Sequence, residues 1–283
     1  MKKILLPTDF SKNALNAILY GLELFKNEKC LFYILNTYTP NFYRLDYLIG
    51  GPAVSTIPDK GVDASLEGLE WTLDHISKKY LNPLHQYETV SAFNTLTDHV
   101  QEICSKENID MIIMGTQGAS GAKEFFLGSN TVHVIRKSNT PVLAIPENYQ
   151  FKSIEHILFP TDYARKYKSK DIGLLKELAI KWDATIHIIH AAEGDEKSSA
   201  QLQNKEHLGK LFEGRKVVFE DITEQYKPNI VHSYVEDNQI DLIAMMNKKH
   251  AFLERLLVKQ NVDAIGYSSN VPFLVIRDTS ENT

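Results

Sequence analysis

Cysteine is nearly absent from this sequence, which has only two, Cys30 and Cys104, in 283 residues. A disulfide-stapled secreted scaffold needs a far higher cysteine density, so this class of protein is excluded. Cys30 lies beside a strand-like pattern and Cys104 inside a helix-like pattern. We expect both to be free thiols in a reducing compartment. Nothing near either residue in the sequence would stabilise a thiolate, so neither is predicted to be catalytic.

Long apolar runs are also missing. No run approaches the ~18 residues that indicate a membrane span. Only Ile4, Leu5 and Leu6 separate Lys3 from Pro7, whereas a secretory signal has an apolar core of about 7–15 residues. We therefore expect a cytoplasmic chain with no membrane partner.

Positive charge is not in excess either, since 31 Lys and Arg residues stand against 36 Asp and Glu, for a net charge of −5. A nucleic-acid binder usually carries a basic footprint, so no nucleic-acid partner is expected. The hydrophobic share of 43% and the charged share of 24% are those of a globular chain, which excludes wholesale disorder and a collagen-like fibre. At about 150 residues per domain, the length is sufficient for two domains.

Three blocks of sequence occur twice in the same order. Lys3–Phe10 returns as His156–Tyr163 at an offset of 153, whereas Ile109–Met114 and Asn139–Ile145 return as Ile240–Met245 and Asn270–Ile276 at an offset of 131. Such internal similarity predicts two copies of one domain. We place the domains at residues 1–148 and 152–278, with the boundary in the polar stretch Glu147–Ser153.

The fall in offset from 153 to 131 means that the first copy has 22 extra residues. They fall after its second strand, in the glycine- and proline-containing stretch Thr37–Gly61, which has the composition of a loop. Loops longer than about 12–15 residues often serve as a lid or an interface. A mobile insertion of no consequence is the alternative.

Short apolar runs alternate with segments of helical spacing along both copies. In the first copy the predicted strands are Ile4–Leu6, Leu31–Leu35, Val90–Phe93, Met111–Met114 and Val142–Ile145, and the predicted helices are Ser11–Phe25, Leu66–Leu81, Leu96–Lys106 and Val132–Ser138. In the second copy the predicted strands are Ile157–Phe159, Ile186–Ile189, Val217–Phe219, Leu242–Met245 and Phe273–Ile276. The pattern predicts an α/β fold of two tandem doubly wound, Rossmann-like domains, each with a parallel sheet covered on both faces.

A set of glycines follows the strand Met111–Met114, where ligands bind in doubly wound sheets. Gly115 and Gly118 are followed, after nine residues, by Gly128 and Ser129 at the start of a predicted helix. Glycines let a backbone approach a ligand closely, and the first amides of a helix bind anions. The spacing matches neither a Walker A loop nor the Rossmann G-x-G-x-x-G. Glycines that only shape turns are the alternative.

An aspartate, Asp9, stands at the end of the first strand. Its carboxylate could accept hydrogen bonds from an adenine or ribose group, or it could cap the following helix beside Ser11. The two roles can coexist.

With these residues, the sequence resembles the universal stress protein family over nearly all of both halves. The resemblance is carried by Pro7–Ser11, by Met114–Ser129 and by Lys137–Val142, and the family's ATP-binding signature, G-2x-G-9x-G-(S/T), is matched in full. It implies an adenine nucleotide alpha hydrolase-like fold and an ATP-binding stress-response function. It also implies that Val142–Ile145 and Phe273–Ile276 pair the two halves as a pseudo-dimer, and it leaves a homodimer of chains open.

The resemblance further implies which residues contact the nucleotide. Asp9 and Thr37 would contact the adenosine end, and Thr37 departs from the aliphatic residue usual in the family. The remaining contacts would be Met114 and Gly115 at the nucleoside and Gly118, Gly128, Ser129 and Asn130 at the ribose and phosphates. The ligand would be ATP, or AMP or ADP in its place, with Mg²⁺ held through the phosphates.

The second copy departs from the motif at the same places. At the offset of 131, the three glycines and the serine of the motif are replaced by Met246, Lys249, Lys259 and Gln260. Of the polar residues expected to contact the nucleotide, only the aspartate and the asparagine have identical counterparts, Asp162 and Asn261. Side chains at these positions would face phosphate, so we expect this half to keep the fold without the site.

No catalytic set or metal site is predicted. His187 and His190 are three apart on a predicted strand and so point to opposite faces, as core histidines and not as a metal pair. We expect a nucleotide-dependent regulatory module that is not an enzyme, with slow ATP hydrolysis left open. A metabolite- or partner-binding sensor without nucleotide and, less favoured, an adenylate-forming enzyme are the alternatives; the latter would need an acid, base or nucleophile beside the glycines.

Overall fold

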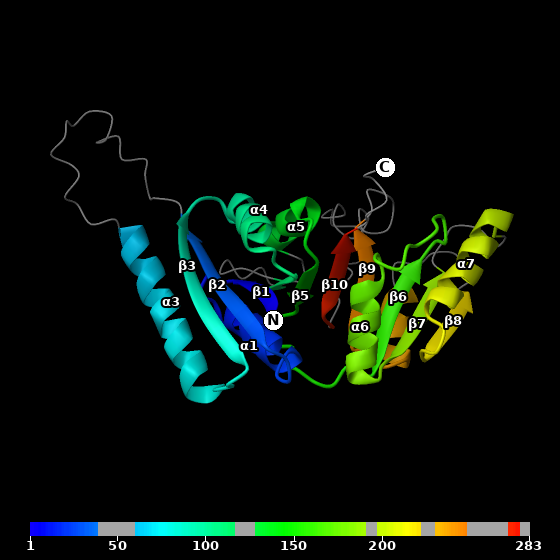
Figure 1. Cartoon of the computed structure of the whole chain (residues 1–283), viewed down its shortest axis with the longest axis horizontal. Helices are drawn as coiled ribbons and strands as arrows, with labels where there is room; N and C mark the ends of the chain where they lie inside the picture. Colours follow the sequence, from blue (N-terminus) through cyan, green and yellow to red (C-terminus); the bar gives the residue numbers. More distant parts are fainter. Residues whose placement is uncertain (39–59, 117–127, 191–196, 222–229, 248–270, 278–283) are drawn as a thin grey trace, which may run out of the picture. The chain divides into compact units, whose positions relative to one another are not determined.

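The computed structural model describes residues 1–38, 60–116, 128–190, 197–221, 230–247 and 271–277 (Figure 1). The described residues divide into two compact units, the first ending at Thr140 and the second beginning at Pro141. No helix in the described ranges has both the length and the apolar character needed to cross a membrane.

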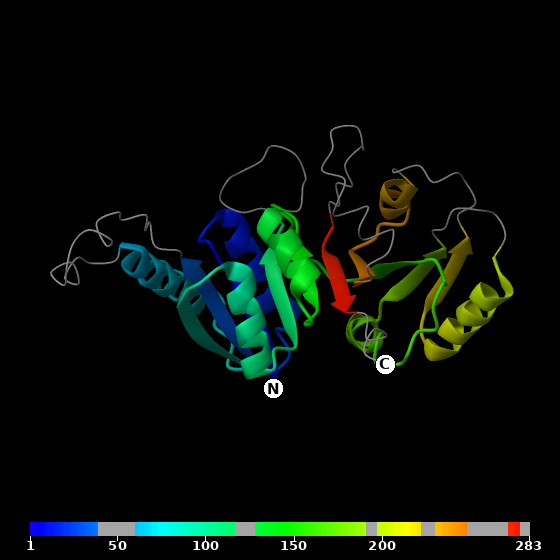
Figure 2. The same cartoon turned by 90° about the horizontal axis from the view of Figure 1, so that it is seen from above.

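The first unit is an open parallel sheet with helices on both faces. Its elements are β1 (Lys2–Pro7), α1 (Lys12–Leu24), β2 (Cys30–Tyr38), α3 (Lys60–Lys79), β3 (His85–Phe93), α4 (Leu96–Glu107), β4 (Met111–Gly115) and α5 (Ser129–Lys137). The strand order is β3-β2-β1-β4. Figure 2 shows α1 and α3 on one face and α4 and α5 on the other. From β1 the chain proceeds to β2 and β3 on one side of the sheet and then returns to β4 on the other side of β1. The carboxyl ends of β1 and β4 therefore form the topological switch point, where ligands bind in such sheets.

The second unit repeats this plan. Its elements are β5 (Val142–Ile145), β6 (His156–Thr161), α6 (Gly173–Trp182), β7 (Thr185–His190), α7 (Ser199–Leu211), β8 (Val217–Asp221), α8 (Ile230–Asp237), β9 (Leu242–Asn247) and β10 (Phe273–Arg277). The strand order is β5-β10-β9-β6-β7-β8. Helices α6 and α7 lie on the face opposite α8 (Figure 2).

The predicted strands and the parallel doubly wound fold are confirmed, with one antiparallel addition. Strand β5 pairs with β10 in antiparallel register, with Leu143 opposite Leu274. The pairs β1–β2, β1–β4, β2–β3, β6–β7, β6–β9, β7–β8 and β9–β10 are parallel. The expected pairing between the last strands of the two sequence copies, β5 and β10, is therefore present, and both strands lie in the second unit.

Strand β3 is longer than its prediction, which covered only Val90–Phe93. Its first residues, from His85 to Thr89, alternate in burial and include exposed polar side chains. A strand at the edge of a sheet pairs on one side only and does not need a continuous apolar run. The prediction, which relied on apolar runs, therefore missed the first half of this strand.

Helix α1 packs closely on the sheet through a glycine. A Cβ at Gly21 would lie 3.0 Å from Cδ1 of Ile113 in β4 and 3.4 Å from Cδ2 of Leu6 in β1. The side chains of Ala17 and Ile18, both fully buried, extend the same face of the helix. This packing fixes the start of α1 over the carboxyl ends of β1 and β4.

Candidate functional site

The carboxyl ends of β1, β2 and β4 lie side by side in the first unit. The Thr8 backbone N–H donates to the Leu35 carbonyl at 2.8 Å, and the Asn36 side-chain amide donates to the Thr8 carbonyl at 2.7 Å. Asn36 is buried and Thr37 half-buried beside it. The end of β2 is therefore tied to the end of β1, next to Asp9.

A tight turn carries the chain from β1 into α1. Phe10 takes a positive φ of 64°, and its backbone N–H donates to Thr8 Oγ1 at 3.0 Å. Ser11 caps the helix by accepting from the Ala14 N–H, while Asp9 Oδ1 accepts from the Ser11 N–H at 3.0 Å. The cap is thus Ser11, and Asp9 shapes the turn while its side chain remains exposed to solvent.

Gly115 ends β4 directly beneath the first turn of α1. A Cβ at this position would lie 2.7 Å from Nδ2 and 2.9 Å from Cγ of Asn13. Any larger residue would therefore displace the Asn13 side chain, which is buried. Glycine is required here by the close approach of the helix to the strand end.

Helix α5 begins at the second part of the glycine motif, and its start carries no side-chain cap among the described residues. Gly128 is the N-cap, and the exposed Ser129 and Asn130 form the first turn, which has no acidic residue. The first amides of a helix lack intrahelical partners and carry partial positive charge. An anion such as a phosphate suits this helix start.

The backbone at Gly128 does not itself require glycine. Its φ of −57° and ψ of 151° fall in the extended region that every residue adopts. Chain conformation therefore does not explain why a glycine stands at this position.

The structure brings most of the predicted site residues to one edge of one sheet. Asp9, Thr37, Met114, Gly115, Gly128, Ser129 and Asn130 come from four segments that meet at the carboxyl ends of β1, β2 and β4. Met114 is only 5% exposed, so its side chain is mostly core and its backbone is what this edge presents. Gly118 and most of the stretch Thr37–Gly61 lie outside the described residues.

Sequence reasoning missed three polar residues that build this edge: Asn13, Asn36 and Thr131. Each is buried, at 6%, 8% and 2% exposure respectively. A signal was present, because at the offsets of 153, 154 and 131 the second copy has Lys166, His190 and Val262 in their place.

The second unit keeps the turn, here after β6, but not its surroundings. Tyr163 has a φ of 51°, its N–H donates to Thr161 Oγ1 at 3.1 Å, and Asp162 Oδ1 accepts from the Ala164 N–H at 2.9 Å. Helix α6, however, starts only at Gly173, so the first turns that carry Asn13 in α1 have no helical counterpart.

Side chains of the second unit fill the space near its turn. The Tyr163 ring stacks on His190, with centroids 5.3 Å apart and planes 5° apart, and both residues are buried. Side chains of α7 bond the turn backbone, with Gln201 donating to the Asp162 carbonyl and Asn204 to the Tyr163 carbonyl, each at 2.8 Å. The corresponding Phe10 lies instead against Gly68 of α3. The second copy thus keeps the fold, whereas the loss of its site stays a prediction, because Lys249, Lys259, Gln260 and Asn261 lie outside the described residues.

The cysteines have the character of structural residues. Cys30 is fully buried, and burial raises the pKa of Cys104 to about 11 despite a hydrogen bond with Thr140. A reactive cysteine has a lowered pKa, so the environment of Cys104 disfavours the thiolate.

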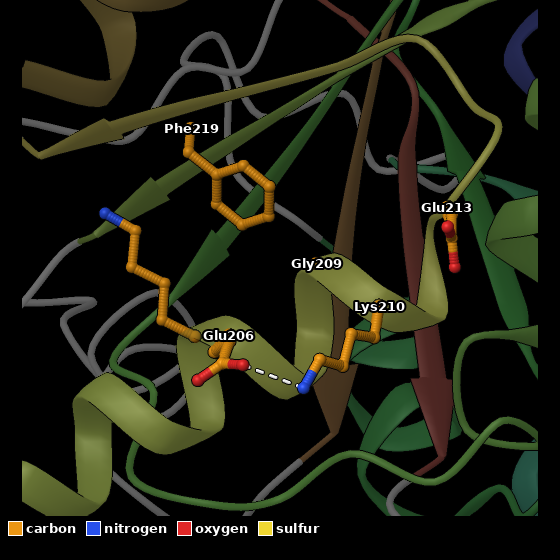
Figure 3. A pocket seen from close by; sticks show the side chains of 6 residues that line it. Glu206, Gly209, Lys210, Glu213 and Phe219 are labelled. Atoms are coloured by element: carbon orange, nitrogen blue, oxygen red, sulfur yellow. Dashed lines mark ion pairs between the residues drawn. The ribbon is translucent and has the colours of Figure 1, made fainter.

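A separate hollow of about 710 Å³ opens between α7 and β8 in the second unit (Figure 3). It is lined by the Phe219 ring, the backbone at Gly209 and charged side chains of both signs, of which Glu206 and Lys210 pair with each other at 2.7 Å. Both members of that pair are about 70% exposed. The hollow lies on the outer strand, away from the strand ends, and its charges are already paired or solvated, so we do not assign it as the site.

A chain of hydrogen bonds crosses the other face of the second sheet. His156 Nδ1 and His187 Nε2 are 3.0 Å apart, His187 Nδ1 and the Tyr234 hydroxyl are 3.0 Å apart, and that hydroxyl donates to Glu220 at 2.8 Å. Since the single Tyr234 hydrogen goes to Glu220, His187 must donate from Nδ1 and accept at Nε2 when it is neutral. His187 thus serves the core, and no group of three potential metal ligands occurs in the described ranges.

Acid is expected to destabilise the second unit. Burial, then the neighbouring His156, lowers the pKa of His187, and burial with Lys197 lowers the pKa of His190. A histidine whose folded pKa lies below its unfolded value of about 6.5 contributes stability that is complete above that pH and is lost as the pH falls. Each histidine then adds at most about 1.4 kcal/mol per pH unit to the slope of the unfolding free energy.

Urea denaturation between pH 7.5 and 5, followed by a probe in the second unit, measures this slope. His187→Gln is expected to be less stable at pH 7.5 and to have a shallower slope than the unmodified chain. Equal slopes for the two proteins would contradict the assignment of the acid sensitivity to His187.

Comparison with known proteins agrees with this architecture. The model of the universal stress protein family matches twice, at residues 1–146 and 153–277. Universal stress protein MJ0577 of Methanocaldococcus jannaschii is 29% identical over 153 residues, which are 51% of this chain and 94% of that protein. Slr1230 of Synechocystis is 27% identical over 175 residues, 61% of this chain and 59% of that protein.

A solved structure has a similar fold over nearly the whole chain. A universal stress protein from Archaeoglobus fulgidus superimposes with a TM-score of 0.67 at 21% identity and covers 99% of this chain and 97% of its own. That likeness concerns the fold, whereas the two matches to the family model cover almost the entire sequence. The chain is therefore a member of the universal stress protein family, with two copies of the family's domain in tandem.

Proposed function

We propose that the first domain binds ATP, with Mg²⁺ carried on its phosphates, and that the chain acts as a nucleotide-dependent regulatory module in the stress response. The observation that carries the proposal is the start of α5, where a glycine that the backbone does not require precedes an uncapped first turn. These free amides would hold phosphate oxygens. The family's glycine signature, complete only in this half, supports the same assignment.

The rest of the edge suits a nucleoside. Asp9 and Thr37 at the ends of β1 and β2 would contact the adenosine, and Met114 with Gly115 would lie against it. Gly118, Gly128, Ser129 and Asn130 would hold the ribose and phosphates. AMP and ADP would bind through the same contacts with fewer phosphates.

We further propose that the domain binds the nucleotide without acting as an enzyme on it, and that the protein acts in the cytoplasm. The free, reduced cysteines fit a reducing compartment. A chain that bound ATP and released pyrophosphate on adding a carboxylate substrate would instead be an adenylate-forming enzyme.

Titration of the full chain with ATP and MgCl₂ by calorimetry tests this function, with GTP as the comparison nucleotide. We expect saturable binding of ATP and weaker binding of GTP, because the adenine end would contact specific groups at Asp9 and Thr37. No heat and no retention of labelled ATP on equilibrium dialysis would refute nucleotide binding and favour a metabolite or partner sensor.

A further inference from the structure

The two stems of the glycine segment are joined by a pair of hydrogen bonds below the candidate site. The Gly128 N–H donates to the Thr116 carbonyl, and the Thr131 hydroxyl donates to the Gly115 carbonyl at 2.9 Å. The first bond is between backbones, so it does not depend on a side chain. The second depends on a side chain, and Thr131 is only 2% exposed.

The hydroxyl of Thr131 links the two parts of the motif. Thr131 is the third residue of α5, whose first residues carry the phosphate-facing amides, and Gly115 ends β4 beneath Asn13. Strands β1 and β4 pair at Ile4 with Met111 and at Leu5 with Ile112, and Gly115 lies three residues further along β4. The Thr131 hydrogen bond, together with the backbone bond from Gly128 to Thr116, therefore holds the start of α5 next to the end of β4.

The second copy provides an internal comparison. At the offset of 131, Thr131 corresponds to Val262, a residue of nearly the same shape without a hydroxyl. Strands β9 and β10, which flank this position along the chain, still form and pair in register. The hydroxyl is therefore absent from the copy that has lost the glycine signature, while the fold of that copy persists.

We infer that Thr131 is a positioning residue for nucleotide binding, which orients the first turn of α5 toward the phosphates through its hydrogen bond to Gly115. The Thr131 hydroxyl is buried and bonded to the Gly115 carbonyl, so it acts on the site through that bond and not through a contact with the ligand. This inference rests on the proposed ATP binding. It assigns a role to a residue outside the glycine signature.

The test compares two buried threonines that make the same kind of bond. Thr131→Val removes the hydroxyl at nearly constant shape, and Thr72→Val is the matched control. Thr72 is 1% exposed, lies on α3 of the same unit, and donates its hydroxyl to the Gly68 carbonyl at 2.8 Å. That bond is internal to one helix and joins no parts of the motif.

Affinities for ATP with Mg²⁺ and for adenosine are measured on the full chain by calorimetry, after urea denaturation has given the stability of each variant. Thr131→Val is expected to bind ATP about tenfold more weakly, with adenosine affinity nearly unchanged, because only the phosphates depend on the start of α5. Thr72→Val is expected to bind both ligands as the unmodified chain does. Thr131→Ser, which keeps the hydroxyl, is expected to restore ATP binding.

Each outcome decides the inference. Equal ATP affinity in Thr131→Val and the unmodified chain, or equal losses for ATP and adenosine, would overturn it while leaving the proposed function intact. An unmodified chain that binds no ATP would overturn the proposed function as well. If Thr131→Val fails to fold, Thr131→Ala and Thr131→Ser take its place, and equal ATP affinities in that pair would overturn the inference.

Discussion

Replacing Gly128 by valine is expected to weaken ATP binding about a hundredfold, or about 2.7 kcal/mol, with little loss of stability. The backbone there has φ −57° and ψ 151°, a conformation that valine adopts without strain. The new side chain would stand at the N-cap of α5, above the amides proposed to bind phosphate. Each charge-assisted hydrogen bond it prevents would contribute about 1.5–3 kcal/mol.

Gly173→Val is the matched control for this prediction. Gly173 is the first residue of α6, and nothing lies within 4 Å of a Cβ built on it. Calorimetric titration with ATP and Mg²⁺ should therefore give the affinity of the unmodified chain for this variant. If Gly128→Val binds ATP as tightly as Gly173→Val, the phosphate site is not at the start of α5.

The largest expected change in stability comes from Phe32→Ala. Phe32 is fully buried on β2, with its ring centroid 4.8 Å from that of His85 and 5.8 Å from that of Tyr87 on β3. Truncating a buried phenylalanine removes transfer free energy and leaves a cavity, at a cost of about 3–5 kcal/mol. The unfolding free energy of the first unit, measured by urea denaturation, should fall by that amount.

Phe93→Ala makes the same chemical change on the neighbouring strand. Phe93 is 63% exposed at the end of β3, with the Tyr38 ring 6.0 Å away. Surface substitutions of this kind usually change stability by less than about 0.5 kcal/mol. Comparable losses for Phe32→Ala and Phe93→Ala would contradict the assignment of Phe32 to the core.

Most of the fold could be read from the sequence because its strands are short, buried and apolar. Strand β4, for example, is buried along its whole length, and its apolar run is visible without any structure. Strand β3 could be predicted only in part, because its outer position allows polar residues such as Glu88 that break the pattern. The late start of α6 could not be predicted, since the turn that precedes it, at Tyr163, is the same as the one at Phe10.

The candidate site was predictable where the motif is local and not where it depends on tertiary contacts. Gly128 and Ser129 are adjacent to the helix that they begin, so spacing alone identified them. Asn13 and Gly115 are 102 residues apart, and the Asn13 side chain occupies the space where a Cβ at position 115 would lie only because α1 lies over β4. Comparing the two copies of the domain can identify such residues from sequence, because a residue needed only for the site is free to change in the copy that lacks the site.

The number of nucleotides bound per chain tests the central claim most directly. The full chain is saturated with ATP and MgCl₂, separated from free ligand by rapid ultrafiltration and extracted with acid, and the nucleotide is identified and counted by chromatography. The account predicts one adenine nucleotide per chain in the unmodified protein and in Gly173→Val, and almost none in Gly128→Val. Two per chain would contradict the loss of the site in the second domain, and none in the unmodified protein would contradict nucleotide binding itself.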